Sequence, residues 1–374
     1  MLYNLLRTSM EKYYSISEAA DILGVNKETL RRWDKTGKFT TNRNPINNYR
    51  VYTANQVNQF VKDLQLDYVT QYTTEKLENP YFKTALGELY NMDVIKFLGT
   101  VASETVDLIF ADPPYNIKKA EWDSFQSQKQ YVEWSLAWIR EAHRILKPNG
   151  ALYICGFSEI LADIKWAANY MFKGCKWLVW FYRNKANLGN DWGRSHESIL
   201  HFRKGKDFIF NMDEIRIPYN AHTLKYPKRP QAVTSQYSNG KGKQYIWEPN
   251  PQGAKPKDVL EIPTLSNGSW ERTAHETQKP VELVKRCVLS SSYPGHLIVD
   301  PFGGSGTTFA VAEAFSRKWL GTEINPVYCE IIKQRLSNSI EINRIATGKD
   351  EIEAVERRKK LRVKKTPDII QYQF

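Results

Sequence analysis

Residues 297–308 read LIVDPFGGSGTT, an apolar strand pattern that runs directly into a glycine-rich turn. A helical pattern follows over residues 309–315. In a strand, turn and helix in this order, glycines let the backbone approach a nucleotide-like ligand because no Cβ stands in the way. The free amides of the helix N-terminus can then bind an anionic group, here a carboxylate. The stretch predicts a ligand-binding turn in an α/β domain, with an ordinary structural turn as the alternative.

An acidic residue, Glu323, closes the next strand pattern at residues 319–322. A carboxylate in this place can accept hydrogen bonds from both hydroxyls of a ribose. The turn lacks the third glycine of the dinucleotide fingerprint, and no lysine follows it as in a phosphate-binding loop. The pattern therefore favours a nucleoside-containing ligand other than a dinucleotide.

A second motif, Asp112-Pro113-Pro114-Tyr115, follows the β-rich pattern of residues 105–111. Asp112 supplies a carboxylate that can accept hydrogen bonds from a flat amino group. The prolines keep the backbone extended and remove competing N–H donors, so the carbonyl of Pro113 is a second acceptor. Tyr115 adds an aromatic face on which a base can stack. Alone, this tetrapeptide would be an ordinary turn; together with the glycine motif it predicts a site for an amino-bearing base.

Strand and helix patterns alternate around these two motifs. Residues 131–146 have helical periodicity, the Lys-Pro-Asn-Gly sequence at 147–150 ends that helix, and residues 151–155 form a strand pattern. Such alternation predicts a parallel α/β sheet. We assign the α/β domain to residues 86–345, after a linker at 73–85.

Residues 1–72 form a separate helical unit. A helix is expected within 14–25, with Ser17 as its N-cap, and a turn at Gly24 leads to a second helix over 26–33. This arrangement is a helix-turn-helix signature, typical of DNA-binding domains. A helical hairpin that contacts another protein is the alternative.

The second helix would face a DNA groove with Arg31 and Arg32. Residues 47–52, which include Arg50, resemble the wing of winged-helix domains of the MerR and excisionase type. Arginines placed in this way bind phosphates or base edges. We therefore expect Arg31, Arg32 and Arg50 to contact DNA.

The positive charge of the chain is concentrated in one window. The chain has 53 Lys and Arg against 41 Asp and Glu. Residues 204–257 hold ten of the Lys and Arg but only four of the Asp and Glu. A basic segment attracts a polyanion, and aromatic side chains provide surfaces on which bases stack. A long insert of this composition is typical of a functional excursion from an α/β domain. The DNA contacts expected within it are Lys225, Lys228, Arg229, Lys241 and Lys243.

A second basic region is the C-terminal tail, residues 346–374, with seven Lys or Arg within 357–365. It is either a solvated charged helix or an arm that contacts nucleic acid. No apolar stretch is long enough to span a membrane, and the four cysteines lack metal-ligand or disulfide-framework spacing. We expect a cytoplasmic protein with no membrane partner and no metal.

The combination of motifs resembles the beta class of S-adenosylmethionine-dependent DNA methyltransferases that act on exocyclic amino groups. The resemblance is carried by the order of the two motifs, the basic insert between them and the segment His275–Pro280 ahead of the glycine motif. Smaller agreements lie at 91–93, 146–150 and 196–200. It spans about residues 86–345 and omits the N-terminal unit and the tail.

The resemblance implies a Rossmann-like, mostly parallel-sheet methyltransferase fold with a target-recognition insert at 204–272. It implies methyl transfer to adenine N6 in double-stranded DNA, by base flipping and direct displacement. The implied catalytic residues are Asp112, Pro113, Pro114 and Tyr115. The implied cofactor-binding residues are Asp93, Asp112, Thr277, Lys279, Asp300, Pro301, Phe302, Gly303, Gly304, Ser305, Gly306, Thr307, Thr308 and Glu323.

Within the cofactor set, the resemblance gives Glu323 the ribose, Asp93 the adenine ring, and Thr277 and Lys279 the methionine carboxylate. Asp112 at the first motif position favours adenine N6, whereas serine tends to accompany cytosine N4. Cytosine-N4 methylation and a DNA-binding regulator with an inactive methyltransferase fold are the alternatives. The expected partner is double-stranded DNA, and a cognate restriction endonuclease within a restriction–modification system and a homodimer are further candidates.

Overall fold

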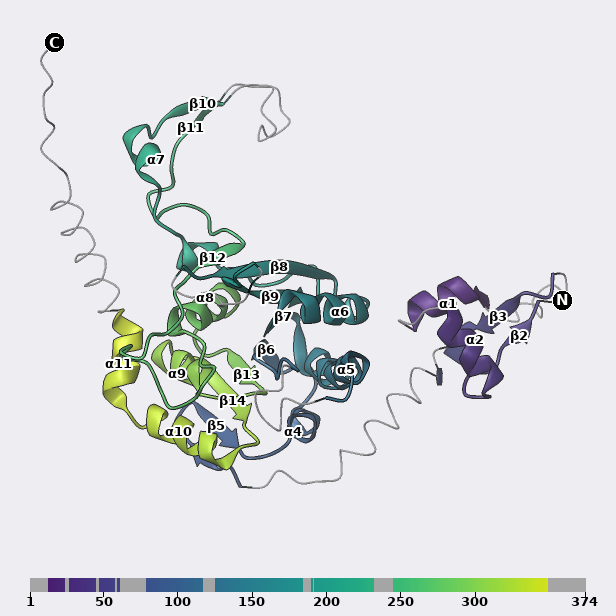
Figure 1. The fold of residues 1–374 in the computed structure, drawn as a ribbon. Helices are drawn as coiled ribbons and strands as arrows, with labels where there is room; N and C mark the ends of the chain where they lie inside the picture. Colours follow the sequence, from purple (N-terminus) through teal and green to yellow (C-terminus); the bar gives the residue numbers. More distant parts are fainter. Residues whose placement is uncertain are drawn as a thin grey trace, which may run out of the picture.

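The computed structural model contains a small N-terminal unit and a larger α/β unit with an insert (Figure 1). The residues it describes are 13–23, 27–44, 47–57, 59–60, 79–116, 125–183, 190, 192–231 and 245–348. The expectations that fall partly or wholly outside them are the two ends of the N-terminal unit, the turn at Gly24, the start of the linker, the lysines at 241 and 243, and the tail from residue 349. No helix in the described part of the chain is long and apolar enough to cross a bilayer.

The larger unit is built on one mixed sheet, to which the described residues contribute nine strands. Most neighbouring pairs are parallel; the antiparallel ones are β8 with β9, β9 with β7, and β5 with β4. This confirms the expected mostly parallel α/β sheet. The strands lie in the order β12 (Val259–Glu261), β8 (Gly174–Phe181), β9 (His196–Arg203), β7 (Leu146–Gly156), β6 (Val106–Ala111), β13 (Leu297–Asp300), β14 (Lys318–Thr322), β5 (Gly87–Tyr90) and β4 (Phe82–Lys83).

Helices cover both faces of the sheet (Figure 1). One face packs against α4 (Val94–Thr100), α5 (Gln128–Ile145) and α6 (Ser158–Ala168). The other packs against α8 (Val281–Ser291), α9 (Thr307–Ala314), α10 (Pro326–Leu336) and α11 (Ser339–Thr347). All six residues of β6 are buried, as expected for a central parallel strand, and its alternate side chains enter the two cores.

Three boundaries differ from the sequence-based expectation. α5 begins at Gln128 because the side chain of Ser127 accepts a hydrogen bond from the amide of Gln130 and caps the helix. The Lys-Pro-Asn-Gly sequence at 147–150 ends the helix as expected but already belongs to β7, whose pairing with β6 shifts register there. The sheet also begins earlier than residue 86, since β4 pairs with β5.

The N-terminal unit has a core of its own, made by Ala19, Leu30, Phe39, Tyr52 and Val57 among others. Its elements are β1 (Tyr13–Ser15), α1 (Ile16–Ile22), α2 (Lys27–Lys35), β2 (Asn42–Arg43) and β3 (Arg50–Thr53). The strands form a three-stranded antiparallel sheet, β1–β3–β2, among the described residues.

The expected cap of the first helix, Ser17, was wrong. The hydroxyl of Ser15 accepts from the amide of Glu18, and the Glu18 carboxylate accepts from the amide of Ser15. This reciprocal capping box satisfies two amides at once, so the helix starts before Ser17.

The insert contributes a 3₁₀ helix, η2 (Met212–Ile215), the short helix α7 (Ala221–Lys225) and the hairpin of β10 (Arg229–Gln231) and β11 (Tyr245–Trp247). In Figure 1, α7 and this hairpin form an arm that projects from the sheet near β12. β12 lies within the expected insert at 204–272 but pairs in parallel with β8, so it is an edge strand of the main sheet.

Candidate active site

A cavity of about 450 Å³ opens where four neighbouring strands, β7, β6, β13 and β14, reach their carboxyl ends. Phe157, Asp112, Pro301 and Glu323 each follow one of these strands and line the cavity. Binding sites of open α/β sheets lie at this edge because the loops after parallel strands meet there. The volume is in the range of small-molecule and cofactor pockets.

The residues predicted for catalysis and cofactor binding are brought together here. All four residues of the Asp112–Tyr115 motif line the cavity, and so does every residue of the expected cofactor set except Gly306. Gly306 is instead the N-cap of α9, with φ of 73°. We refer to residues 301–308 as the glycine turn.

The glycine turn has a conformation that depends on two of its glycines. Gly304 has φ of 49° and Gly306 φ of 73°, a region that side chains with a Cβ rarely adopt. A Cβ added at Gly304 would lie 3.3 Å from Nε2 of His275. The amide of Gly306 donates to the carbonyl of Gly303 at 2.7 Å, which closes the turn. A side chain at Gly304 would therefore strain the backbone and press against the ring of His275.

Glu323 fixes the turn from the next strand. Its Oε2 accepts a hydrogen bond from the amide of Gly304 at 2.7 Å, and its Oε1 accepts from the amide of Asn325 at 2.8 Å. Burial raises the pKa of this carboxyl group. A carboxylate has about four lone-pair sites, so each oxygen of Glu323 can accept one further hydrogen bond from a ligand hydroxyl.

Two other acidic residues shape the same wall. Asp300 is buried and accepts from the amide of Phe302 at 2.9 Å, and burial raises its pKa to about 8. Asp93 caps α4 by accepting from the amides of Ile95 and Lys96. Both line the cavity, and both are partly committed to backbone hydrogen bonds.

A second wall is a charged cluster around Asp112. The hydroxyl of Tyr115 lies 2.7 Å from Oδ1 of Asp112 and 3.2 Å from Oε2 of Glu197. The ammonium of Lys279 lies 2.8 Å from Oδ2 of Asp112 and 3.5 Å from Oε2 of Glu197. We call these four residues the carboxylate cluster.

The cluster carries net negative charge next to the cavity. Burial lowers the pKa of Lys279, but the carboxylates of Asp112 and Glu197 raise it by more, so the pKa is well above its ordinary value. Burial and the same carboxylates raise the pKa of Tyr115, which keeps its proton. Two carboxylates therefore face one ammonium, and positive charge that develops on a bound group is stabilised there.

Aromatic side chains form the remaining walls. The ring of Phe157 meets Tyr115 edge-on at 5.0 Å, and the guanidinium of Arg194 lies 4.1 Å above Phe157. Trp180 lines the cavity as well; it is 3% exposed, and its indole N–H donates to the carbonyl of Ile262. The cavity therefore offers apolar aromatic surface beside the carboxylate cluster.

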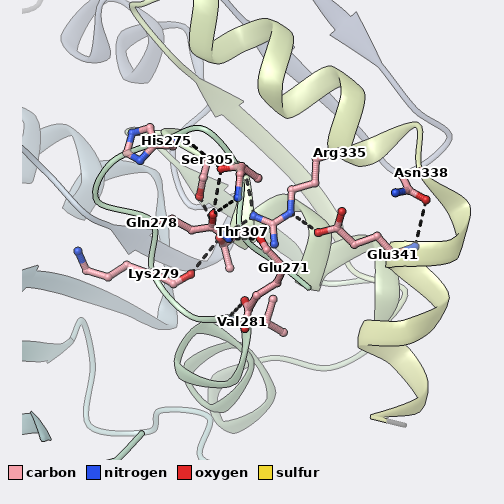
Figure 2. Close-up of polar contacts among 11 residues, drawn as sticks. Glu271, His275, Gln278, Lys279, Val281, Ser305, Thr307, Arg335, Asn338 and Glu341 are labelled. Atoms are coloured by element: carbon pink, nitrogen blue, oxygen red, sulfur yellow. Dashed lines mark hydrogen bonds and ion pairs between the residues drawn. The ribbon is translucent and has the colours of Figure 1, made fainter. Parts of the chain in front are cut away.

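The segment before α8 lies beside the glycine turn, as Figure 2 shows for His275 and Lys279 next to Ser305 and Thr307. The ring of His275 lies against the glycine turn, and burial lowers its pKa to about 4. Gln278 accepts from Thr273 and donates to the carbonyl of Glu271. The backbone carbonyl of Lys279 accepts from the hydroxyl of Thr307, while its side chain reaches the carboxylate cluster.

Glu197 and Phe157 are cavity residues that the sequence did not single out. Glu197 lies in the segment 196–200, which resembles the family, but the resemblance implies no role for its carboxylate. Lys279 was expected at the methionine carboxylate of a cofactor, yet its ammonium contacts Asp112. Among the described residues, no group of three or more His, Cys, Asp or Glu side chains could hold a metal ion.

The expected DNA contacts that fall within the described residues do not line the cavity. Arg31 and Arg32 are exposed on α2, and Arg31 pairs with Glu28. Arg50 is half-buried and pairs with Asp34 at 2.8 Å. In the arm, Lys225 and Lys228 are exposed, and Arg229 belongs to β10.

Three comparisons with known proteins agree with this arrangement. Residues 106–334 match the family model of a DNA methylase, and residues 14–62 match that of a MerR HTH family regulatory protein. The type II methyltransferase M.BamHI of Bacillus amyloliquefaciens is 35% identical over 266 residues, which are 69% of this chain and 59% of that protein. The type II methyltransferase M1.MboII of Moraxella bovis is 31% identical, over 69% of this chain and 99% of that protein.

Two further proteins extend the comparison. The DNA adenine methyltransferase YhdJ of Escherichia coli (strain K12) is 33% identical, over 65% of this chain and 80% of that protein. The solved structure of the cytosine-N4-specific PvuII DNA methyltransferase superposes with a TM-score of 0.52 at 19% identity, over 72% of this chain and 96% of that one. That structure shares the fold. The family model and these relatives together show that the chain belongs to the DNA methylase family.

Proposed function

We propose that this protein transfers a methyl group from S-adenosylmethionine to adenine N6 at a specific sequence in double-stranded DNA. The observation that carries the proposal is the placement of Asp112 and Tyr115 on one wall of a cavity whose other wall is the glycine turn. One wall suits a flat amino-bearing base and the other suits a nucleoside cofactor.

The donor set of the cofactor wall fits S-adenosylmethionine. Gly304 gives the turn a backbone conformation that side chains rarely adopt, and Glu323 retains lone pairs for a ribose. The amides at the start of α9 suit a carboxylate. When bound, S-adenosylmethionine supplies an electrophilic methyl group on a positively charged sulfur.

The carboxylate cluster would hold the amine to be methylated. A flipped base costs a few kcal/mol to extract, and stacking on Tyr115 returns about 1–3 kcal/mol. Asp112 accepts a hydrogen bond from the amino group and orients its nitrogen toward the glycine turn. The nitrogen gains positive charge during the reaction and then loses a proton, which we assign to Asp112, while Glu197 adds negative charge nearby.

The choice of base rests on Asp112. The relatives include one named as an adenine methyltransferase, and the structural neighbour is named as cytosine-N4-specific. Aspartate at the first position of the motif favours adenine in this family, and the purified protein can be tested directly. Incubation with unmethylated DNA and methyl-labelled S-adenosylmethionine should give labelled N6-methyladenine after nucleoside analysis. Label in 4-methylcytosine would replace the proposal by the cytosine alternative.

We assign recognition of the target sequence to the insert. Its arm carries exposed Lys225 and Lys228 and the aromatic side chains of Tyr226 and Trp247. Such a surface combines attraction to phosphates with stacking platforms. Exchange of the insert for that of a relative should change the methylated sequence while cofactor affinity stays constant. An unchanged target would place recognition elsewhere.

The N-terminal unit is proposed to add a second contact with DNA. The exposed arginines of α2 and the match to a MerR-type helix-turn-helix support this role. We further propose a cytoplasmic enzyme that works with a cognate restriction endonuclease in a restriction–modification system, and that forms a homodimer.

A further inference from the structure

A buried arginine outside the cavity holds the glycine turn from behind. Arg335 lies on α10 and is 3% exposed. Its Nη1 donates to the carbonyl of Ser305 at 3.1 Å and to the hydroxyl of Thr307 at 2.9 Å. Its Nε donates to Oε1 of Glu341 on α11 at 2.7 Å. Figure 2 shows this side chain reaching from its helix to the turn.

The hydroxyl of Thr307 is fully used by these contacts. It donates its one hydrogen to the carbonyl of Lys279 at 3.1 Å and accepts from Arg335. The hydroxyl of Ser305, 3.0 Å away, must then donate to it as well. The side chain of Lys279 continues to Asp112 on the other wall of the cavity. Polar contacts therefore run from Arg335 to Asp112 through two intermediate residues, Thr307 and Lys279.

Stability alone does not explain a buried arginine at this position. Removing a guanidinium and a carboxylate from water costs several kcal/mol, and apolar replacements of buried ion pairs are often neutral or stabilising. What arginine supplies is geometry, because its planar fork bonds a carbonyl, a hydroxyl and a carboxylate at fixed angles. Those three partners belong here to the turn, to α9 and to α11.

We propose that Arg335 is a positioning residue that sets the glycine turn relative to Lys279 and, through it, relative to Asp112. The inference rests on the proposed function, which assigns one wall to S-adenosylmethionine and the other to the target amine. Reacting groups held on separate walls must keep their spacing within a fraction of an ångström. Arg335 provides that spacing by anchoring the turn and Thr307, whose hydroxyl bonds the backbone of Lys279.

The test compares Arg335→Met with Arg317→Met in the full-length protein. Arg317 is a matched control: it is 5% exposed and donates to the carbonyls of Phe315 and Ser292, none of which line the cavity. Both variants should unfold at a lower temperature. Arg335→Met alone should bind S-adenosylmethionine more weakly in calorimetry, by roughly 10- to 100-fold, and lower kcat at saturating cofactor.

Arg335→Lys keeps the positive charge but not the planar fork of donors, so cofactor affinity and kcat should fall in the same direction by smaller factors. This variant carries the test if Arg335→Met does not fold. Parental cofactor affinity in both Arg335 variants would overturn the inference, as would an equal loss of affinity in Arg317→Met. A weaker affinity with unchanged kcat at saturation would overturn the link to Asp112. If the parent protein itself fails to bind S-adenosylmethionine, the proposed function fails and the inference falls with it.

Discussion

The ammonium of Lys279 lies 2.8 Å from Oδ2 of Asp112, although 167 positions separate the two residues in the sequence. Lys279 is 7% exposed, so this ion pair is largely removed from water. The contact ties the segment before α8 to the loop after β6. Lys279 binds one oxygen of the Asp112 carboxylate, and the hydroxyl of Tyr115 donates to the other, so both oxygens have a partner.

Replacing Lys279 by methionine should inactivate the protein while preserving the apolar stem. Two carboxylates, those of Asp112 and Glu197, would then lie in the cavity without their cation, and breaking a buried pair from one side costs about 3–5 kcal/mol. We expect a lower unfolding temperature and a loss of kcat of about 100-fold or more. The control is Lys333→Met, at an exposed position of α10 that pairs with Glu330. Equal activity of the two variants would refute this role of Lys279.

Glu197→Gln should separate the chemical step from cofactor binding. The variant keeps a side chain of the same shape near Tyr115 but removes one of the two negative charges of the carboxylate cluster. We expect kcat to fall roughly 10- to 100-fold because positive charge on the amine is less stabilised. Cofactor affinity in calorimetry should not change. The control is Glu261→Gln, at an exposed position on β12, and it should leave kcat and cofactor affinity unaffected. A parental kcat for Glu197→Gln would show that the charge of Glu197 is dispensable.

His201 should make the folded protein sensitive to acid. Its ring stacks on Tyr153 at 4.3 Å, and burial, with a smaller effect of Arg203, lowers its pKa from 6.5 to about 3. The folded state thus favours the neutral ring, so its stabilisation is complete above pH 6.5 and is lost as pH falls toward 3. The slope approaches about 1.4 kcal/mol per pH unit within that window.

His201→Phe keeps the stack and removes the titration, so thermal unfolding should depend less on pH between 6 and 4. Part of the acid sensitivity should remain, because burial also lowers the pKa of His143 and of His275 to about 4. His222→Phe, at an exposed position in the arm, is the control. An identical pH dependence in His201→Phe and the parent would contradict the assignment.

Deletion of residues 1–72 should leave a methyltransferase with the same target sequence. The core of the N-terminal unit shares no residue with the two cores of the α/β unit. DNA affinity should fall, and its dependence on salt should become shallower, because phosphate contacts are lost. A double variant, Arg31→Ala with Arg32→Ala, should reproduce part of both effects. A changed target sequence would make the unit part of recognition, and unchanged affinity and salt slope would favour a regulatory or protein-contact role.

The sequence predicted those parts of the site that lie in contiguous motifs. The Asp112–Tyr115 motif and the glycine turn each combine a strand pattern with residues whose backbone restrictions are local, so their place at strand ends could be predicted. Glu323 could be found because its spacing from the turn is fixed by one helix and one strand.

The roles of isolated charged residues could not be predicted from the sequence in this way. Glu197 and Arg335 act through partners far away in the sequence, and a single glutamate or arginine in a strand or helix is most often a solvated side chain. The resemblance placed the ammonium of Lys279 at the cofactor. Its contact with Asp112 could not be predicted, because it depends on how two loops far apart in the sequence pack together. The cap of α1 is Ser15 and not Ser17, because Ser15 and Glu18 satisfy each other's backbone amides.

Asp112 is proposed to serve the methylation of adenine N6. This role can be tested by single-base mapping of methylated positions in DNA from cells that express the parent protein or Asp112→Ala. We expect N6-methyladenine in one sequence context with the parent and none with the variant, whose cofactor affinity changes far less than its activity. Methylation by Asp112→Ala, or 4-methylcytosine in place of N6-methyladenine with the parent, would contradict it.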